Sequence, residues 1–524
     1  MFFKEWVPQP LRVVLCLLCA FSFQLSGGIY LSSASQMVGS LALMQEDIMM
    51  AGYASFVGMT VAFPVLFRLK FRFTSRSIFL VVCPVIIVCN IITMNTGNLA
   101  ILIATCFVAG AFRIWGTFEC LSNVQLSLTP TRDFGVFFPV VYLIVLGSIQ
   151  VSGLITVHIG DWITWRQMHL FIMGLMLVVW LTLLLFTRHF RFMKPLPLYG
   201  IDWIGGTLWS VFLLALIFAF EYGEYFDWLD AWQIRLAFIV AAVALLVNVA
   251  RMYILRHPFI EIDALKYRNM VPLLFLFFML YMFLSTPNLL QNIFTNSILQ
   301  FDPLNVASLN WWNLAGTIAG CIAAYYWHAR LHGNYMTPVA VGFGLIVAYQ
   351  AVMYFLIDPR LNIEYLYLPT FLRGMGYIIL YISLTVYASG VVPFKHFFQV
   401  LSLIGFVRTG FAPAMGTAIF GRILQYVLPA NLQKLTIDLD MTNRAFSQMP
   451  YGEVYGEAMR QATLVSLREI YGLTVVVGII FMILLLSHKY LRLNSVGRLP
   501  GMRHLKRIAK RAITTPLAHL AHKT

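Results

Sequence analysis

The chain has 524 residues, of which 60% are hydrophobic and only 11% are charged, with a formal net charge of +15. Soluble globular domains are about 45–50% apolar and about 25% charged, so this chain has roughly half the charge of a water-facing surface. The composition excludes an ordinary cytosolic enzyme, a disordered protein and a secreted disulfide scaffold, and it predicts a polytopic helical membrane protein.

Fourteen segments are apolar for long enough to cross a membrane, which takes about 20 residues of helix. The first lacks a small-residue cleavage site, so it is expected to be a retained helix and not a signal peptide. Pro287 interrupts the ninth, which is either one span or a shorter helix with a bent end. The predicted spans are 13–34, 48–68, 77–95, 99–126, 135–157, 167–187, 204–221, 231–250, 270–298, 304–328, 335–357, 363–388, 397–427 and 470–488.

Lysine and arginine are concentrated in alternate connectors and in the tail of the chain. One set of connectors includes 68–76, 188–194 and 251–269, while those between them are acidic or neutral, as at Glu46 and Asp47. Because a basic excess marks the cytoplasmic side, both termini are predicted to be cytoplasmic, in a cell (inner) membrane. The charge is attributed to the membrane surface and not to nucleic acid. A missed hairpin would preserve the alternation, so twelve spans remain an alternative.

Two connectors are longer than is usual between helices. Segment 253–269 is amphipathic and is predicted to lie on the cytoplasmic face of the membrane. Segment 428–469 is external, mixed in charge and helical in pattern toward Arg468, and it is either a solvated loop or a docking surface. If the host has two membranes, the partners at that surface would be a periplasmic adaptor and an outer-membrane channel.

An internal repeat links the fourth and fifth predicted spans to the twelfth and thirteenth. In each pair an Arg-x-x-Gly sequence, Arg113–Gly116 or Arg373–Gly376, is followed by a polar turn with proline and then by a Phe-Phe pair. Paired repeats around a midplane site are typical of secondary transporters. The predicted domains are an N-terminal six-helix bundle (1–195), an inserted two-helix hairpin (196–252), a connector (253–269), a C-terminal six-helix bundle (270–488) and a basic cytoplasmic tail (489–524).

This 6+2+6 layout resembles the fourteen-helix drug:proton antiporter branch of the major facilitator superfamily, the EmrB/QacA-type exporters. The resemblance covers about residues 13–488 and implies an all-α major-facilitator-type fold, proton-coupled export and no cofactor other than the proton motive force. The stretches that carry it are, in chain order, 64–80 at the helix 2–3 loop motif, Arg113 with Gly116, Asp161 and Trp162 with Trp165 and Arg166, IDWIGG at 201–206, HPFIEIDALKYRN at 257–269, and 406–409 with Gly416 and Thr417.

The chain departs from the family pattern at three places. Where the loop motif has Gly, Asp and Gly, this sequence has Phe67, Lys70 and Thr74. The glycine-rich motif of helix 5 is reduced to Gly147 and Gly153. Helix 1 contains no acidic residue, although an aspartate is common there in this branch.

Ionisable residues at bilayer depth cost at least about 2.5–3.5 kcal/mol on insertion scales and are functional candidates by default. Arg113, Arg373 and Arg408 are expected near the midplane, where they either face a cavity or bond groups of neighbouring helices. Glu119 lies about 240° around the helix from Arg113, so the two do not share a face. A carboxylate in a low-dielectric site can exchange a proton near neutral pH. Glu119 is therefore the candidate proton carrier, the alternative being a carboxyl group fixed against a neighbouring helix.

The predicted substrate cavity combines these arginines with residues at helical spacing from the carboxylate. Trp115 and Asn123 lie four residues to either side of Glu119, on its face of the helix. Three fixed positive charges against one titratable carboxylate sum to about +2 to +3, which favours anions. Lipophilic weak acids are therefore expected to be better substrates than quaternary-ammonium dyes. The predicted cavity residues are Arg113, Trp115, Asn123, Arg373, Tyr377 and Arg408.

The sequence contains no hydrolase or nucleotide-binding motif and no metal-ligand spacing, so no enzymatic activity and no metal are expected. The predicted function is proton-coupled efflux of lipophilic or amphipathic small molecules by alternating access. The alternatives left open are a dedicated exporter or importer of one endogenous lipid or metabolite, a polytopic membrane enzyme, and a transport-dead scaffold.

Overall fold

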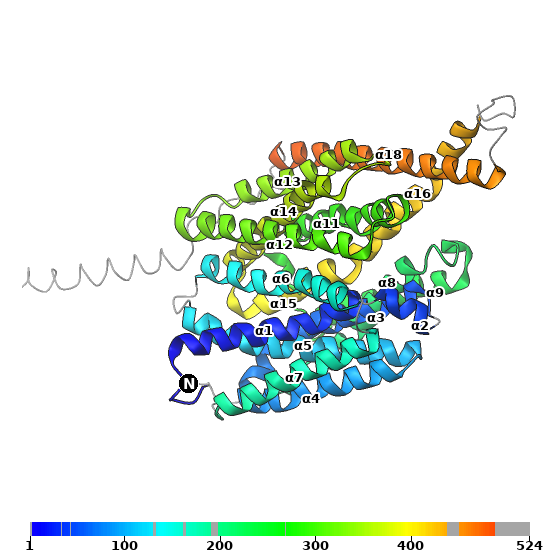
Figure 1. The fold of residues 1–524 in the computed structure, drawn as a ribbon. Helices are drawn as coiled ribbons and strands as arrows, with labels where there is room; N and C mark the ends of the chain where they lie inside the picture. The colour runs from blue at the N-terminus through cyan, green and yellow to red at the C-terminus, as the bar shows by residue number, and fades with distance from the viewer. Residues whose placement is uncertain are drawn as a thin grey trace, which may run out of the picture.

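The computed structural model describes residues 3–32, 34–41, 43–128, 133–160, 164–189, 198–267, 269–437 and 450–487. Almost all of these residues are helical, and the long helices run side by side (Figure 1). The predicted tail (489–524) and parts of several connectors lie outside the described residues. We refer to the end of the bundle at which α1 begins as the N-terminal end and to the opposite end as the far end.

The first part of the chain and the following hairpin contain helices that begin at polar caps. Thr74 accepts the backbone N–H of Ser77 at the start of α4, and Asp202 accepts that of Gly205 at the start of α8. These helices are α1 (Gln9–Ser32), α2 (Ala34–Leu41), α3 (Gln45–Arg72), α4 (Ser75–Asn95), α5 (Leu99–Leu128), α6 (Phe134–Gly160), α7 (Trp165–Phe186), α8 (Trp203–Glu221) and α9 (Trp232–Ile254).

The rest of the chain contains several helices that widen locally into π-helix. Through Pro287 the ninth predicted span stays helical as far as Ile298, so it is one continuous segment and not a shortened helix. The elements are α10 (Asp263–Lys266), α11 (Met270–Thr286) with η2 (Pro287–Gln291) and η3 (Ile293–Ile298), α12 (Pro303–Tyr325) with η4 (Tyr326–Leu331), α13 (Met336–Leu356), α14 (Tyr367–Val391), α15 (Phe394–Gly405), η6 (Phe406–Phe411), α16 (Ala412–Thr436) and α18 (Tyr451–Ser487).

The described residues contain 13 helical segments that are long and apolar enough to cross a membrane. Helix α12 is not among them, although it corresponds to the predicted span 304–328; its first half is polar, with Asn305, Asn310 and Asn313. It packs against α6 and α14, where Asn313 is buried, while Asn305 is exposed. The chain is thus an all-helical, multi-pass membrane protein, as the sequence predicts.

The long helices form two groups, seen at the bottom and the top of Figure 1. In the first, α5 packs against α1, α3 and α4, and α7 packs against α4. In the second, α14 packs against α12 and α13, and α18 packs against α13 and α16. The groups meet where α6 contacts α12 and α14, and where α3 contacts α15 and η6. These groups correspond to the predicted bundles, whose boundaries at 195 and 270 stay predictions.

The hairpin of α8 and α9 is attached to both groups. Helix α8 packs against α3 of the first group and α16 of the second. At the far end the Tyr222 hydroxyl donates to Asp47 of α3, and the side-chain amide of Gln425 in α16 donates to Glu224 (2.5 Å). At the N-terminal end, the carboxylate of Asp202 accepts hydrogen bonds from Arg251. The hairpin therefore lies along the junction between the groups.

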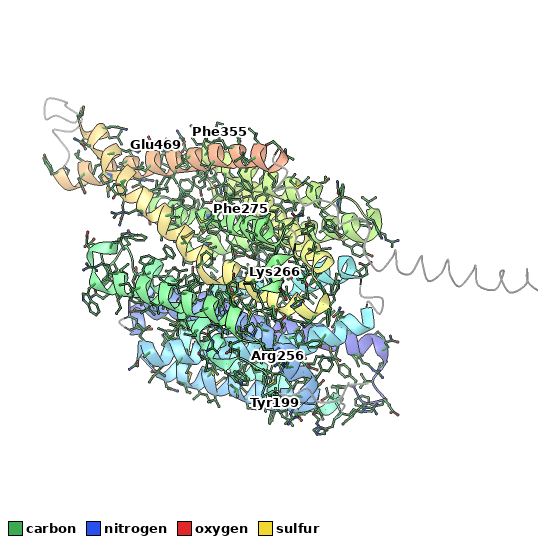
Figure 2. The ribbon with its side chains drawn as sticks, turned by 180° about the vertical axis from the view of Figure 1, so that it is seen from behind. Tyr199, Arg256, Lys266, Phe275, Phe355 and Glu469 are labelled. Carbon is green, nitrogen blue, oxygen red and sulfur yellow. The ribbon has the colours of Figure 1, made fainter. Side chains whose placement is uncertain are left out.

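The segment 428–469, which the sequence predicts to be external, is not a loop over most of its described length. Helix α16 continues to Thr436, and α18 begins at Tyr451, well before the predicted span. With 37 residues, α18 is about 55 Å long at 1.5 Å per residue, against about 30 Å of bilayer core. The side chain of Asn431 donates to Ser466 (3.1 Å) and Glu469 (2.8 Å), which ties the two helices together. We call 428–436 with 451–469 the arm; Figure 2 shows it projecting past Glu469.

Reporter fusions test the predicted orientation of these helices. Fusions at residue 228 and within 450–465 are expected to report the outside of the cell, and fusions at 195 or 260 the inside, because the basic connectors lie at the N-terminal end. The measurement is the paired activity of an alkaline phosphatase and a fluorescent-protein reporter at each position. A reversed pattern at any of the four positions would contradict the 6+2+6 topology.

Candidate functional site

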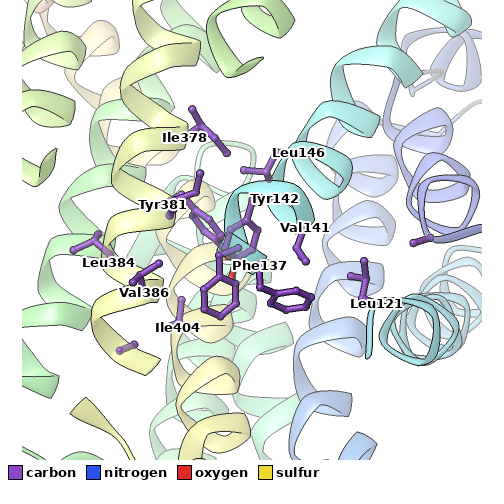
Figure 3. Packing of buried hydrophobic residues seen from close by; sticks show 14 of the residues in the cluster. Leu121, Phe137, Val141, Tyr142, Leu146, Ile378, Tyr381, Leu384, Val386 and Ile404 are labelled. Atoms are coloured by element: carbon purple, nitrogen blue, oxygen red, sulfur yellow. The ribbon is translucent and has the colours of Figure 1, made fainter. Parts of the chain in front are cut away.

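Tyrosines from both groups of helices surround Arg408 where α6, α11, α14 and η6 meet. The Nη1 atom of Arg408 donates to the Tyr381 hydroxyl (2.6 Å), and the guanidinium lies 4.7 Å from the centre of that ring. On the other side, Tyr381 meets the ring of Tyr142 in α6 edge to face at 4.5 Å (Figure 3). The hydroxyls of Tyr281 and Tyr377 lie 2.8 Å apart beside them. We call these five residues the arginine–tyrosine cluster.

Helix geometry brings the members of the cluster together. Tyr377 and Tyr381 are four residues apart in α14, and Arg373 precedes them by one turn, so all three lie on one face. Arg408 lies in η6, a π-helical turn between two α-helical stretches. Such a turn changes which residues face the neighbouring helices and is frequent at functional sites. The cluster can therefore hold a charged group at the contact between the two groups of helices.

Arg373 has acceptors within the second group of helices. Its Nη1 donates to the side-chain oxygen of Gln291 (3.1 Å), and the guanidinium lies 5.8 Å from the centre of the Tyr349 ring. The Tyr349 hydroxyl donates to the same oxygen (3.0 Å). These bonds join η2, α13 and α14. Arg373 has the geometry of the predicted alternative, in which an arginine holds neighbouring helices together.

Arg113 lies in a different environment in the first group. Its side chain is buried, with 5% exposed, and its guanidinium packs against Gly27 of α1. Among the described residues, Nη2 of Arg113 makes a weak contact with the sulfur of Met59, at 3.9 Å. The Nε atom has no hydrogen-bond partner among these residues. The guanidinium lines a cavity of about 40 Å³ that lies between α1, α3, α4, α5 and α7.

Glu119 is buried and paired at the N-terminal end of the first group. The Lys70 ammonium lies 3.4 Å from its carboxylate, and the hydroxyl of Ser75 also donates to it. The same Lys70 donates to the hydroxyl of Ser122. Lys70 neutralises Glu119 locally, so the prediction that Glu119 is the one charge opposing the three arginines is wrong. Lys70 lies in the segment 64–80 that resembles the helix 2–3 loop motif, at the position where that motif has aspartate. This segment therefore supplies the cation of the Lys70–Glu119 ion pair.

The predicted cavity residues thus divide among separate places. Tyr377 and Arg408 lie together in the arginine–tyrosine cluster, with Arg373 one turn away. Trp115 packs against Phe73 and Phe112, on the α3 side of α5, away from that cluster. The Asn123 side chain donates to the backbone oxygen of Glu119 (2.7 Å).

Sequence reasoning missed Tyr142 and Tyr281, which complete the cluster, and Gln291, which accepts from Arg373. Tyr142 follows Phe138 of the repeated Phe-Phe pair by one helical turn, a signal that could have singled it out. Nothing in the sequence distinguishes Tyr281 from the other tyrosines of the chain. No group of metal-binding side chains occurs in the part of the chain that the structure describes.

The two groups of helices also meet through phenylalanines at the N-terminal end. Phe67 of α3 lies 5.6 Å from Phe394 and 5.4 Å from Phe398, and Phe118 of α5 lies 5.4 Å from Phe398. Aromatic pairs at these distances are attractive beyond their buried area. We call this contact the phenylalanine seal; its members are Phe67, Phe118, Phe134 and Phe138 of the first group and Phe394, Phe397 and Phe398 of α15.

Several solved structures of membrane transporters share this fold. The structure resembles a POT family transporter in complex with a thioalcohol-conjugated peptide, with a TM-score of 0.57 and 14% identity over 90% of this chain and 95% of that chain. It resembles tetrameric PepTSo2 with a TM-score of 0.56 and 14% identity, over 93% of this chain and 100% of that one. It resembles a mutant of the nucleoside transporter NupG with a TM-score of 0.51 and 12% identity, over 90% of this chain and 99% of that one. These likenesses confirm the predicted fold class.

A curated relative covers part of the chain. Over 282 residues the chain is 22% identical to the colistin resistance protein EmrB of Acinetobacter baumannii. The match takes in 52% of this chain and 54% of that protein, so the chain spans about half the length of the curated relative it matches. No family model matches the chain.

Proposed function

We propose that this protein is a secondary transporter of the EmrB/QacA type, which exports lipophilic or amphipathic small molecules in exchange for protons. Its fold and its partial likeness to the colistin resistance protein EmrB support this proposal. The observation that carries it is the arginine–tyrosine cluster, because the cluster joins α6 of one group to α14 and η6 of the other. Alternating access requires a binding site at such a junction.

In the proposed mechanism the two bundles rock about the cluster. The phenylalanine seal keeps the N-terminal end closed, and this end is the cytoplasmic one in the proposed orientation, in an inner membrane with both termini inside. Loading from the cytoplasm then requires the contacts of α15 with α3, α5 and α6 to separate. Substrate that binds between Tyr142 and Tyr381 replaces the contact between these two rings across the junction. Binding therefore favours the opposite motion, in which the N-terminal end closes and the far end opens.

Glu119 is the proposed proton carrier, and Lys70 is the group that competes with the proton. When the carboxylate takes up a proton it loses its charge, so the ion pair with Lys70 ends and the ammonium keeps its bond to Ser122. Deprotonation restores the pair between α3 and α5. The proton therefore changes how α3 is held, and α3 is one of the helices that form the phenylalanine seal.

The proposed substrates are lipophilic weak acids, and a susceptibility panel tests them. Arg113 and Arg408 stay charged at any cellular pH, so their surroundings favour anions over cations. Deleting the gene is expected to sensitise cells to cholate and acidic antibiotics by at least about fourfold, and restoring it should reverse the change. Sensitisation mainly to quaternary-ammonium dyes would contradict the proposed substrate class.

The arm is the proposed docking surface for a periplasmic adaptor, which would in turn contact an outer-membrane channel. Tyr451 and Tyr455 are 80% and 58% exposed on its outer part, where α18 lies beyond the length that a bilayer covers. Exposed aromatic residues are enriched at protein–protein contacts.

Replacing both tyrosines of the arm tests the partner proposal. The Tyr451→Ser, Tyr455→Ser variant is expected to lose most cellular resistance yet to transport normally in inverted membrane vesicles, since its membrane core is unchanged. The control is Tyr253→Ser, which removes an equally exposed tyrosine (72%) from α9 and should change neither assay. Equal losses in cells and vesicles would assign a folding role to the arm.

A further inference from the structure

The first bundle contains a buried positive charge that none of its described neighbours balances. Arg113 has 5% of its surface exposed, and the residues that line its cavity of about 40 Å³ include no aspartate or glutamate. An arginine keeps its proton inside a protein. A buried charge without a partner is strongly unfavourable, because it loses its hydration and gains no compensating interaction.

The internal repeat provides a direct comparison. Arg373 occupies the corresponding position of the second bundle and donates to Gln291 of the helix beside it. In the first bundle the residue beside Arg113 is Gly27 of α1, and a Cβ atom there would overlap the guanidinium. In the second bundle an acceptor side chain, Gln291, lies beside the arginine. In the first bundle the residue beside the arginine has no side chain, and the Arg113 guanidinium occupies that space.

Two polar side chains that line the cavity, Asn90 and Ser26, do not replace that acceptor. The side-chain oxygen of Asn90 lies 2.8 Å from Nδ1 of His169, while the Asn90 amide donates to the backbone of Ile86 (2.8 Å). The Asn90 oxygen is thus taken up by the His169 ring. The hydroxyl of Ser26 donates to a backbone carbonyl of its own helix (2.7 Å). The cavity wall presents a cation and neutral polar groups, which suits an anion.

We propose that the cavity at Arg113 is a binding site for one small anionic group, either a halide ion or a carboxylate. Its volume of about 40 Å³ exceeds the roughly 10–15 Å³ that one water molecule needs, which suits one small anionic group, and the body of a lipophilic molecule does not fit. A free halide would bind there whatever the protein transports. The alternative source, the carboxylate end of a transported acid, rests on the proposed function.

Thermal unfolding of the purified protein in detergent tests the site without any transport. With the bulky sulfonate MES as the starting anion and ionic strength held constant, chloride or acetate is expected to raise the Tm saturably, by at least about 2 °C. A rise with chloride identifies a free-ion site; a rise with acetate and cholate but not with chloride identifies the carboxylate of a substrate. No saturable rise with any of these anions would overturn the proposal.

Two matched variants locate the effect. Arg113→Gln is expected to abolish the anion-dependent rise, and Arg373→Gln, which removes the corresponding but hydrogen-bonded arginine, is expected to retain it. The same rise in Arg113→Gln would overturn the assignment. If Arg113→Gln does not fold, crystals of the unaltered protein decide, soaked in bromide and, separately, in bromoacetate: an anomalous peak beside the Arg113 guanidinium from either anion supports the site, and a peak from neither overturns it. Neither the Tm nor the anomalous peak depends on transport activity, so both test the anion site even if the protein does not transport.

Discussion

Replacing Arg408 with glutamine is expected to lower transport about 100-fold while leaving the amount of protein in the membrane unchanged. The change removes a charge-assisted hydrogen bond to Tyr381 and the contact of the guanidinium with that ring. Together these are worth about 3 kcal/mol in a desolvated site, and each 1.36 kcal/mol corresponds to a factor of ten in rate. The measurement is the initial rate of cholate uptake into inverted vesicles.

Arg422 provides a control with nearly the same geometry at the surface. Its guanidinium also lies 4.7 Å from a tyrosine ring centre, that of Tyr426, and it donates to that hydroxyl (2.8 Å). Because both groups are exposed, Arg422→Gln is expected to change the rate less than about twofold. The Tyr381→Phe variant keeps the ring and removes the hydroxyl, so its transport rate is expected to lie between those of Arg408→Gln and Arg422→Gln. A rate for Arg408→Gln within twofold of the unaltered protein would exclude a role for the cluster in transport.

Glu119→Gln is expected to abolish the dependence of transport on a proton gradient, because glutamine cannot exchange a proton. Lys70→Gln is expected to lower the free energy of unfolding by about 3 kcal/mol, since it leaves a buried carboxylate without its cation. The double variant should regain most of that stability but not the proton dependence. The measurements are the Tm and the transport rate as a function of external pH.

The Glu119→Gln single variant separates proton coupling from a structural role. If Glu119 only holds α5 against α3, the Glu119→Gln protein will keep the pH profile of the unaltered protein while losing stability. That result would remove Glu119 from the proposed mechanism. Ser122→Ala, which removes a second partner of Lys70 and no charge, is the matched control and should leave the pH profile unchanged.

The sequence predicts the helices of this protein well because the bilayer imposes a simple rule on them. About 20 apolar residues span the hydrocarbon core, and the predicted spans find their helices even where polar residues obscure the pattern, as in α12. The rule fails where helices leave the membrane: α18 begins at Tyr451, although hydropathy alone starts the span at residue 470. Amphipathic helix outside the bilayer carries no length constraint of this kind.

The candidate site was harder to predict, because it depends on which helices are neighbours. The depth of Arg408 and Arg113 could be inferred from rise per residue, but not that tyrosines surround one and a cavity adjoins the other. The ion pair of Lys70 with Glu119 joins residues 49 positions apart, and no spacing rule signals it. The charge sum from sequence therefore overestimated how much Glu119 offsets the arginines.

Proton counterflow in proteoliposomes tests the central proposal most directly. Purified protein is reconstituted with a pH-sensitive dye inside, and a cholate gradient is imposed in the absence of any pH gradient. Coupled exchange predicts that protons move opposite to cholate, and that this movement is lost in Glu119→Gln although the protein is present in equal amount. Cholate movement at the same rate in protein-free liposomes, or movement through the protein without any proton counterflow, would contradict proton-coupled export.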